Sequence, residues 1–387
     1  MPRYRHLSVA IPMLAESANL PSLLQQLCNQ TCQDFTLYVC VNNEEGGYGY
    51  DDNQTTLHLL RSYSQFPIVI IDRSSTGQGW TGKRKGVGWA RKILFDRILS
   101  DHDENEIVVS LDADTDFDNN YFDTLLHTLN LHNQSNALCV PYYHPLSGDP
   151  LLDRPLLRYE CYMRHYLIQL LRIGNPYAFT ALGSAMVFPL WAYKKVGGIT
   201  PLQGGEDFYL MQKFAKTGRI ELLLSTPANS SPVTVRPQGR PSLRVPFGTG
   251  PAIASGMAEM DNRYPFYSPQ AFDAVKATYD TFPDLYLHDL PTPMSPFLCQ
   301  QLDTNDLWSP LRRNFRTPQH FIHACAERVD GLRILQFLKN NPSFRLTPDA
   351  LPVNFLSDPI PQLDNYRNLL FAEEMNLRKK NSFLSIQ

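Results

Sequence analysis

Short apolar runs alternate with amphipathic segments through the first 140 residues of the chain. Each run is four or five residues long, rich in β-branched residues and bounded by polar residues or proline, a pattern typical of strands buried on both faces. Between the runs, apolar residues recur at helical spacing, as in the leucine series that follows the first run. The expected strands lie at residues 7–11, 37–41, 68–71, 107–111 and 137–140, with a further strand-like piece at 181–188.

This alternation predicts an α/β fold with a mainly parallel central sheet flanked by helices. Near Ser255 the composition shifts towards proline and aromatic residues and the alternation stops. Beyond that point, amphipathic helices are expected at residues 318–338, capped by Thr317, and at 365–377. We therefore expect one domain over residues 1–250 and a mostly helical extension over 251–387 that packs on it.

Composition narrows the class of protein. The chain has 387 residues and a formal net charge of −3, which argues against nonspecific nucleic-acid binding. No apolar run approaches the ~20 residues needed to span a bilayer. The basic N-terminus is followed by an apolar stretch that breaks at Pro12, so we interpret it as a first strand rather than a signal peptide.

The seven cysteines are scattered and form no CxxC pair, which favours reduced thiols in a cytoplasm over disulfides or a zinc site. The basic group Arg378, Lys379 and Lys380 complements a helix C-terminus. It is also compatible with weak peripheral contact with the inner face of a membrane.

The segment EIVVSLDADTDF at residues 106–117 carries the main candidate chemistry. Asp112, Asp114, Asp116 and Asp118 come at the end of a predicted buried strand, where open α/β sheets bind ligands. Ionised carboxylates are too costly to bury without positive partners. The turn therefore either holds a divalent metal or caps the helix expected near residues 121–129.

The loop GQGWTGKRKGVG at residues 77–88 matches two phosphate-binding patterns incompletely. The dinucleotide pattern follows the third strand rather than the first, and Arg84 stands where a P-loop needs serine or threonine. What remains is flexible backbone with Lys83, Arg84 and Lys85 just before a helix, which favours an anion site. The alternative is a mobile basic surface loop.

Two later segments also carry charge at expected element ends. Glu206 and Asp207 occupy the first turn of a predicted helix, where acids are also favoured simply as caps. Arg236, Arg240 and Arg244 lie on a segment rich in proline and glycine, so it is extended or looped. These arginines either clamp phosphates or pair with the acids.

The order of these motifs resembles the family 2 glycosyltransferases of the GT-A fold over roughly residues 7–250. The opening strand, loop and helix carry Glu16 and Asn19 where that family commonly has them. After the second strand the family usually has an aspartate pair, whereas this chain has Asn42 and Asn43. The other matching segments are GKRKGVGWAR at 82–91, SLDADTDF at 110–117 and GGEDFYL at 204–210.

The resemblance implies transfer of a sugar from a UDP- or GDP-sugar to a hydroxyl of a glycan or small molecule. Inversion of the anomeric configuration follows from the family's catalytic aspartate. Asp207 would be the general base and Glu206 would orient the acceptor or sugar. Asp114 and Asp112 would hold manganese or magnesium. The donor contacts expected from the strand ends and the resemblance are Pro12, Glu16, Asn42, Asp72, Lys83, Arg84, Asp112, Gly183 and Arg240.

Three other functions stay open at this stage. A P-loop nucleotide hydrolase would use the 77–88 loop, although Arg84 replaces a required ligand. A sugar nucleotidyltransferase shares the architecture and metal need but releases pyrophosphate. A noncatalytic carbohydrate-binding protein would leave four acids, Asp112, Asp114, Glu206 and Asp207, without a role.

Overall fold

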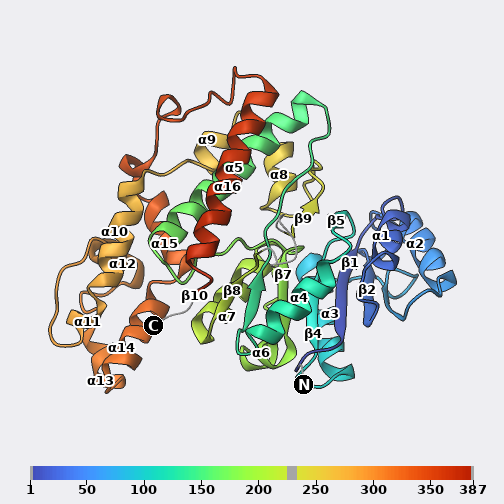
Figure 1. Cartoon of the computed structure of the whole chain (residues 1–387), viewed down its shortest axis with the longest axis horizontal. Helices are drawn as coiled ribbons and strands as arrows, with labels where there is room; N and C mark the ends of the chain where they lie inside the picture. Colours follow the sequence, from blue (N-terminus) through green and yellow to red (C-terminus); the bar gives the residue numbers. More distant parts are fainter. Residues whose placement is uncertain (1–2, 225–232, 385–387) are drawn as a thin grey trace. The chain divides into compact units, whose positions relative to one another are not determined.

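The structure is a computed structural model that describes residues 3–224 and 233–384. The chain divides into two compact units (Figure 1). We call Met1–Leu156 with Phe179–Gly256 the sheet unit, and Leu157–Ala178 with Met257–Gln387 the helical unit. The division falls inside the helix α5 (Pro150–Arg172), so most of this helix groups with the second part of the chain.

The sheet unit contains a mixed, mainly parallel sheet flanked by helices, which confirms the predicted fold class. Its strands lie in the order β8-β6-β7-β4-β1-β2-β3, and Figure 1 shows β1, β2 and β4 side by side. The piece expected at 181–188 forms β7, which runs antiparallel to both neighbours. The bounds are β1 Leu7–Met13, β2 Phe35–Asn42, β3 Ile68–Arg73, β4 Ile107–Ser110, β6 Ala137–Cys139, β7 Met186–Pro189 and β8 Ile220–Leu222.

The helices of this unit bury the apolar stripes that the sequence predicts. Helix α1 (Leu20–Cys28) buries all four of its leucines, and every residue of β4 is buried. A small antiparallel pair, β5 (Thr115–Phe117) with β9 (Val235–Pro237), follows the acidic strand. The remaining helices are α2 Tyr50–Ser62, α3 Val87–Asp101, α4 Tyr121–Leu131, α6 Leu190–Lys195, α7 Glu206–Thr217 and α8 Thr249–Ala254.

The helical unit consists mostly of short helices. The single helix expected at 318–338 is wrong: α14 ends at Arg328 and α15 begins at Gly331. Asp330 breaks the helix because its carboxylate caps α15 and accepts a hydrogen bond from the Arg333 amide at 3.1 Å. The expected Thr317 cap is present. The elements are α9 Met260–Arg263, α10 Pro269–Asp280, α11 Phe282–Leu285, α12 Ser295–Leu302, α13 Ser309–Asn314, α14 Pro318–Arg328, α15 Gly331–Lys339, the 3-10 turns Pro342–Phe344 and Pro348–Ala350, α16 Ile360–Lys380 and β10 Phe383–Leu384.

A buried ion network joins α5 to α16 inside the helical unit. Arg164 on α5 pairs with Glu160 at 2.6 Å and with Glu374 at 2.5 Å. Glu374 also accepts from Arg378 at 2.9 Å, and all four side chains are fully buried. The pairs are mutually dependent because removal of one partner leaves a buried charge uncompensated.

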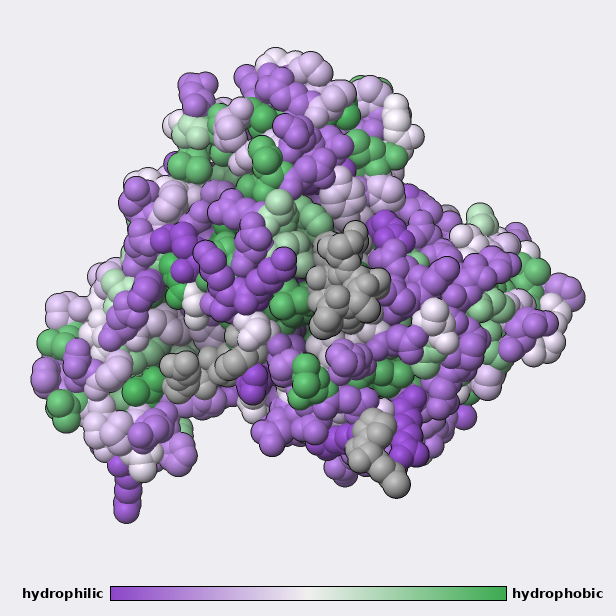
Figure 2. Space-filling model, viewed as in Figure 1, coloured by the Kyte–Doolittle hydropathy of each residue, from purple (hydrophilic) through white to green (hydrophobic). Residues whose placement is uncertain are grey.

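On the face of the molecule drawn in Figure 2, hydrophilic residues predominate and hydrophobic ones are scattered among them. Within the described ranges, no helix combines the length and apolarity that a bilayer crossing requires. The seven cysteines all lie within the described residues, and no disulfide joins any of them.

We expect Glu374→Gln to destabilise the protein by about 3 kcal/mol or more, because the buried guanidinium groups of Arg164 and Arg378 would lose their shared negative charge. Urea denaturation followed by far-UV circular dichroism measures this change. The matched control is Asp280→Asn, which breaks the exposed pair with Lys276 and should change stability by about 0.5 kcal/mol or less. Equal effects of the two substitutions would contradict the role of the buried network.

Candidate active site

A cavity of about 310 Å³ lies in the sheet unit, where the segments after β1 and β4 meet the starts of α3 and α7. Three predicted donor contacts, Asp72, Lys83 and Arg84, are not among its lining residues. The predicted site residues that do line it are Pro12, Glu16, Asn42, Asp112, Asp114, Gly183, Glu206, Asp207 and Arg240.

The buried guanidinium group of Arg91 organises the inner wall. Arg91 projects from α3 and is only 4% exposed. Its Nη1 donates to Glu206 Oε1, and its Nη2 donates to Asp112 Oδ1 at 2.5 Å. These charge-assisted hydrogen bonds tie the acidic turn after β4 to the first turn of α7. The two acidic motifs, almost 100 residues apart in the sequence, therefore share one cation.

Gly183 leaves room for the close approach of that guanidinium. A Cβ atom built at Gly183 would lie 1.9 Å from Arg91 Nη2, so any side chain there would displace the guanidinium from its present position. The carbonyl of Gly183 also accepts a hydrogen bond from Ser110 Oγ at 2.6 Å. The glycine thus places the backbone of the 182–184 segment directly against Arg91, and the segment forms part of the cavity wall.

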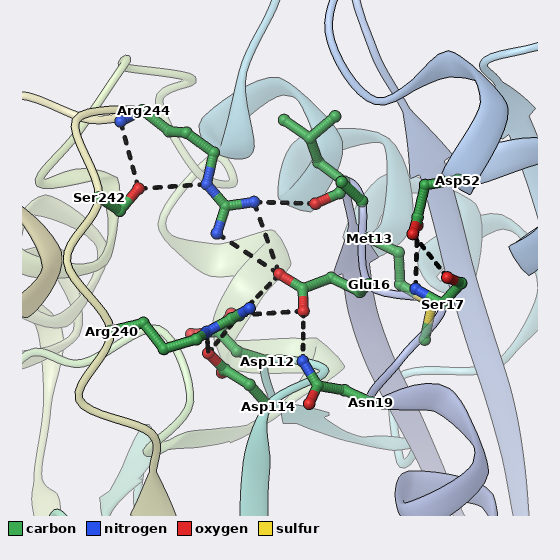
Figure 3. Close-up of polar contacts among 12 residues, drawn as sticks. Met13, Glu16, Ser17, Asn19, Asp52, Asp112, Asp114, Arg240, Ser242 and Arg244 are labelled. Carbon is green, nitrogen blue, oxygen red and sulfur yellow. Dashed lines mark hydrogen bonds and ion pairs between the residues drawn. The ribbon is translucent and has the colours of Figure 1, made fainter. Parts of the chain in front are cut away.

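A second arginine, Arg240, bridges the two acids of the outer wall (Figure 3). Its Nη2 donates to Asp114 Oδ2 at 2.6 Å and to Glu16 Oε1 at 2.8 Å. Nε adds a bond to Asp114 Oδ2 at 3.0 Å. Arg244 donates through Nη1 to the Leu14 carbonyl at 2.8 Å, with Nη2 at 3.4 Å from Glu16. The positive charge expected beside the acidic strand is therefore supplied by arginines.

The loop that carries Glu16 is held in an uncommon backbone conformation. Ala15 has a φ of 55°, in the left-handed region that non-glycine residues rarely adopt. The Asn53 side chain accepts a hydrogen bond from the Ala15 amide at 2.9 Å, and Asn19 donates to Glu16 Oε2 at 2.7 Å. Such strain persists where the surroundings over-determine the backbone, and here it directs Glu16 towards Arg240.

Asp207 differs from its neighbours in having no arginine bonded to its carboxylate within the described residues. The Phe208 amide donates a hydrogen bond to Asp207 Oδ1 at 2.8 Å. Burial, followed by the charge of Glu206, raises the pKa of Asp207 to about 7, against the opposing influence of Arg91. Burial and the charge of Asp112 likewise raise the pKa of Asp114 to about 6, although Arg240 lowers it.

The start of α3 reaches the cavity, whereas the basic loop before it does not. Gly86 and Val87 line the cavity, so the positive end of the helix dipole lies beside it. Lys83 is exposed, and the guanidinium of Arg84 lies 5.5 Å from the Trp89 ring centroid. The predicted cations therefore stand outside the lining residues, whereas Arg91 lies among them.

The glycine loop is not arranged as a phosphate cradle. The amides of Gly77 and Gly79 donate to the two carboxylate oxygens of Glu45, each at 2.9 Å. A carboxylate of the chain itself therefore occupies the donors that a P-loop would offer to phosphate. This arrangement does not support the nucleotide-hydrolase alternative.

Other predicted residues are engaged with the protein itself. Asn42 lines the cavity, but its Oδ1 accepts from Trp80 Nε1 at 3.1 Å and its Nδ2 donates to the Met13 carbonyl at 2.9 Å. Asp72 accepts from the amides of Ser74 and Ser75 at the end of β3. Both side chains stabilise strand ends.

Only two of the four acids in the acidic turn reach the cavity. Asp116 accepts from Gln26 at 2.7 Å, and Asp118 pairs with Arg236 at 2.9 Å. Neither side chain caps the following helix, because α4 begins after Asn120 without a side-chain capping hydrogen bond.

The sequence analysis missed Arg91 as a site residue, although a signal was present. Arg91 follows Val87 by four residues and precedes Leu94 by three, so it occupies the apolar stripe of its helix. A charged residue at such a position must find a buried partner. Further lining residues outside the predicted set are His144, Ser184, Arg244, Phe247 and Thr249.

No family model matches the chain, and no curated protein matches it in sequence. One similar solved structure is residues 1–349 of S. aureus TarS in complex with UDP, at 12% identity and a TM-score of 0.43; the match covers 84% of this chain and 90% of that one. Another is the mannosyltransferase PcManGT from Pyrobaculum calidifontis in complex with GDP-Man and Mn²⁺, at 12% identity and a TM-score of 0.37, covering 97% and 86%. These likenesses are too distant to assign a family or a function.

Proposed function

We propose that the chain transfers a sugar from a nucleotide-diphosphate donor to a hydroxyl acceptor, with inversion, and that Asp207 is the general base. The observation that carries this proposal is the division of charge in one cavity. Asp207 has no bonded cation and a pKa raised to about 7, while Arg240 and Arg244 lie with the other acids. Base and anion-binding groups are the two requirements of this reaction.

The donor diphosphate would bind between the start of α3 and the arginines. Departure of the nucleoside diphosphate develops negative charge, which cations and helix N-termini stabilise. Arg240 keeps Nη1 without a hydrogen bond to the described residues, so this nitrogen is free for a phosphate oxygen. Arg244 is about two-fifths exposed and can bind a second phosphate oxygen.

The cavity has an excess of negative charge that a divalent cation would balance. Its lining residues include five carboxylates and three guanidinium groups, a formal charge of −2 when all are ionised. Asp112 and Asp114 each keep one carboxylate oxygen without a hydrogen bond to the described residues. Hard oxygen ligands suit magnesium and manganese, which are usually held by one or two carboxylates together with phosphate. A metal on Asp112 and Asp114 would supply positive charge to the leaving diphosphate.

Asp207 and Glu206 would have separate roles. Glu206 is buried and bonded to Arg91, so it fixes the guanidinium rather than an acceptor. Asp207 is available to take the proton from the acceptor hydroxyl as its oxygen attacks the anomeric carbon. A pKa near 7 suits this role because about half of the carboxylates are ionised at neutral pH and the ionised form is basic enough to accept a proton.

A panel of UDP- and GDP-sugars with manganese tests the donor class. A ligand that binds the folded state raises the melting temperature, so a sugar nucleotide should stabilise the protein more than the free sugar does. The products then decide the reaction. Nucleoside diphosphate released from the sugar nucleotide indicates glycosyl transfer, with water as a slow acceptor. Pyrophosphate released instead from a nucleoside triphosphate and a sugar 1-phosphate would indicate a sugar nucleotidyltransferase. Absence of nucleotide binding would contradict both.

Asp207→Asn should lower turnover by about 100-fold or more, the scale of losing a positioned general base. Its donor affinity should stay near wild type because size and hydrogen-bonding reach are kept. Release of nucleoside diphosphate measures turnover, and calorimetry measures donor binding. The matched control is Asp116→Asn, outside the cavity, which should leave turnover unchanged. Wild-type turnover in Asp207→Asn would exclude Asp207 as the base.

The pH profile supplies a second check on the base. Because the pKa of Asp207 is raised to about 7 and the ionised form is the active one, kcat/KM should rise with pH up to about 7 and then level off. Below that pH, it should fall almost tenfold per unit as the carboxylate takes up a proton. A profile that stays flat down to about pH 5 would contradict the assignment.

Asp114→Asn should lose the enhancement of nucleotide binding by manganese, by about tenfold or more, because a carboxylate ligand is removed. Calorimetric titration of UDP or GDP with manganese or with EDTA measures this enhancement. Asp118→Asn is the control: the same turn carries this acid, but it pairs with Arg236 away from the cavity. If both variants keep the enhancement, Asp114 does not bind the metal.

A further inference from the structure

A second cluster of side chains that could bind a metal lies at the edge of the sheet where β1 and β4 begin, opposite to the edge that carries the cavity. His6 precedes β1, His102 follows α3, and Glu106 precedes β4. Strand β1 runs seven residues from this edge to the cavity, so at about 3.3 Å per residue the two sites are roughly 20 Å apart. Among the described residues, this is the one group of three or more histidine, cysteine or acidic side chains whose ligand atoms all lie within 4.8 Å of one another.

Tyr38 contacts the ring nitrogen of His102 that does not face Glu106. Its hydroxyl lies 3.2 Å from Asp101 Oδ2, to which it donates, and 2.9 Å from His102 Nε2. When the hydroxyl proton goes to Asp101, Nε2 carries the ring hydrogen of the neutral imidazole. The Nδ1 lone pair of His102 then faces Glu106 Oε2 across 3.6 Å.

In that tautomer the Nδ1 lone pair faces a carboxylate oxygen, and a positive group between the two atoms would stabilise the arrangement. Two ligands at about 2.0–2.1 Å from a tetrahedral zinc ion lie about 3.4 Å apart, close to this separation. Glu106 is 6% exposed, and no lysine or arginine of the described residues pairs with it. The buried carboxylate thus depends on the two imidazoles, or on what they bind, for its positive partner.

His6 completes the set from the other side of Glu106. Its Nδ1 lies 2.7 Å from Glu106 Oε1, and its Nε2 lies 3.2 Å from Thr36 Oγ1. The two imidazole rings are stacked, with centroids 5.4 Å apart. Ser8 Oγ donates to Glu106 Oε1 at 2.6 Å and holds the carboxylate. Each ligand is therefore oriented by a hydroxyl group, the outer-shell arrangement usual for metal-binding histidines.

We propose that Nδ1 of His6, Nδ1 of His102 and the Glu106 carboxylate bind a zinc ion, with water as the fourth ligand. Mixed nitrogen and oxygen ligands suit zinc, whereas the all-oxygen pair Asp112 and Asp114 suits magnesium or manganese. Binding displaces the proton that His6 Nδ1 shares with Glu106 to solvent. The ion cross-links the starts of β1 and β4 to the end of α3 and so stabilises the sheet unit.

The alternative occupant of the gap is a proton on His102, which would make an ordinary ion pair with Glu106. Zinc titration of the metal-stripped full chain at about pH 8, where imidazoles compete little for protons, separates the two. We expect one zinc ion per chain by calorimetry and a rise in melting temperature. Cobalt in place of zinc should give visible absorption bands of a site with nitrogen ligands.

Ligand and outer-shell variants locate the ion. His102→Gln and Glu106→Gln should each weaken zinc binding by at least tenfold. Tyr38→Phe, which keeps the core ring but loses the hydroxyl, should weaken it by about 10-fold to 100-fold. The matched control is His132→Gln: His132 Nδ1 also lies 3.6 Å from a buried glutamate, Glu221, but without a second histidine. Asp114→Asn should keep the zinc stoichiometry, which separates this site from the cavity.

Three results would overturn the proposal. They are failure of the wild-type chain to bind stoichiometric zinc, equal affinity in wild type and Tyr38→Phe, or loss of the ion in Asp114→Asn with retention in His102→Gln. Far-UV circular dichroism confirms that each variant is folded, and Tyr38→Phe provides the decision if a ligand variant does not fold. None of these outcomes bears on the transfer reaction.

Discussion

The buried guanidinium of Arg91 is the interaction on which the rest of the site depends. It pairs with both Asp112 and Glu206, and it is itself almost fully excluded from water. An arginine in such a place is stable only while both acids are ionised and in position. Helix α3, the turn after β4 and the first turn of α7 are therefore held in register by one side chain, and Asp207 takes its electrostatic surroundings from the same group.

The cavity is short of positive charge, and the unequal fate of its acids follows from that shortage. Asp112, Glu206 and Glu16 each have an arginine within 3 Å. Asp207 has no such arginine among the described residues, and its pKa is raised further than that of Asp114. Paired acids serve as anchors, whereas the unpaired acid keeps the proton affinity that a base needs.

The strands and the acidic turn could be predicted from the sequence because they depend on local patterns. Apolar runs marked the strands. The acidic turn was expected directly after one of them, and β4 ends at Ser110, two residues before Asp112. The pairing of Arg240 with Glu16 could not be predicted, since it joins residues 224 positions apart through a segment without periodicity. The role of Asn42 was likewise set by a tertiary contact with Trp80, whereas Asp72 is engaged locally by the amide of Ser75, three residues further on. Arg91 and Asp330 were readable locally, one as a charge in an apolar stripe and the other as an N-cap.

The pairing of Arg240 with Glu16 and Asp114 also has a consequence for folding during synthesis. The first strand and the acidic strand can pair once residue 110 has left the ribosome, but Glu16 and Asp114 lack their cation until residue 240 follows. Contacts between residues so distant in sequence form late, after the loop-closure entropy has been overcome. During synthesis the nascent sheet therefore carries Glu16 and Asp114 without their arginine partner. A fragment that stops before Arg240 would lack this positive charge in the cavity wall.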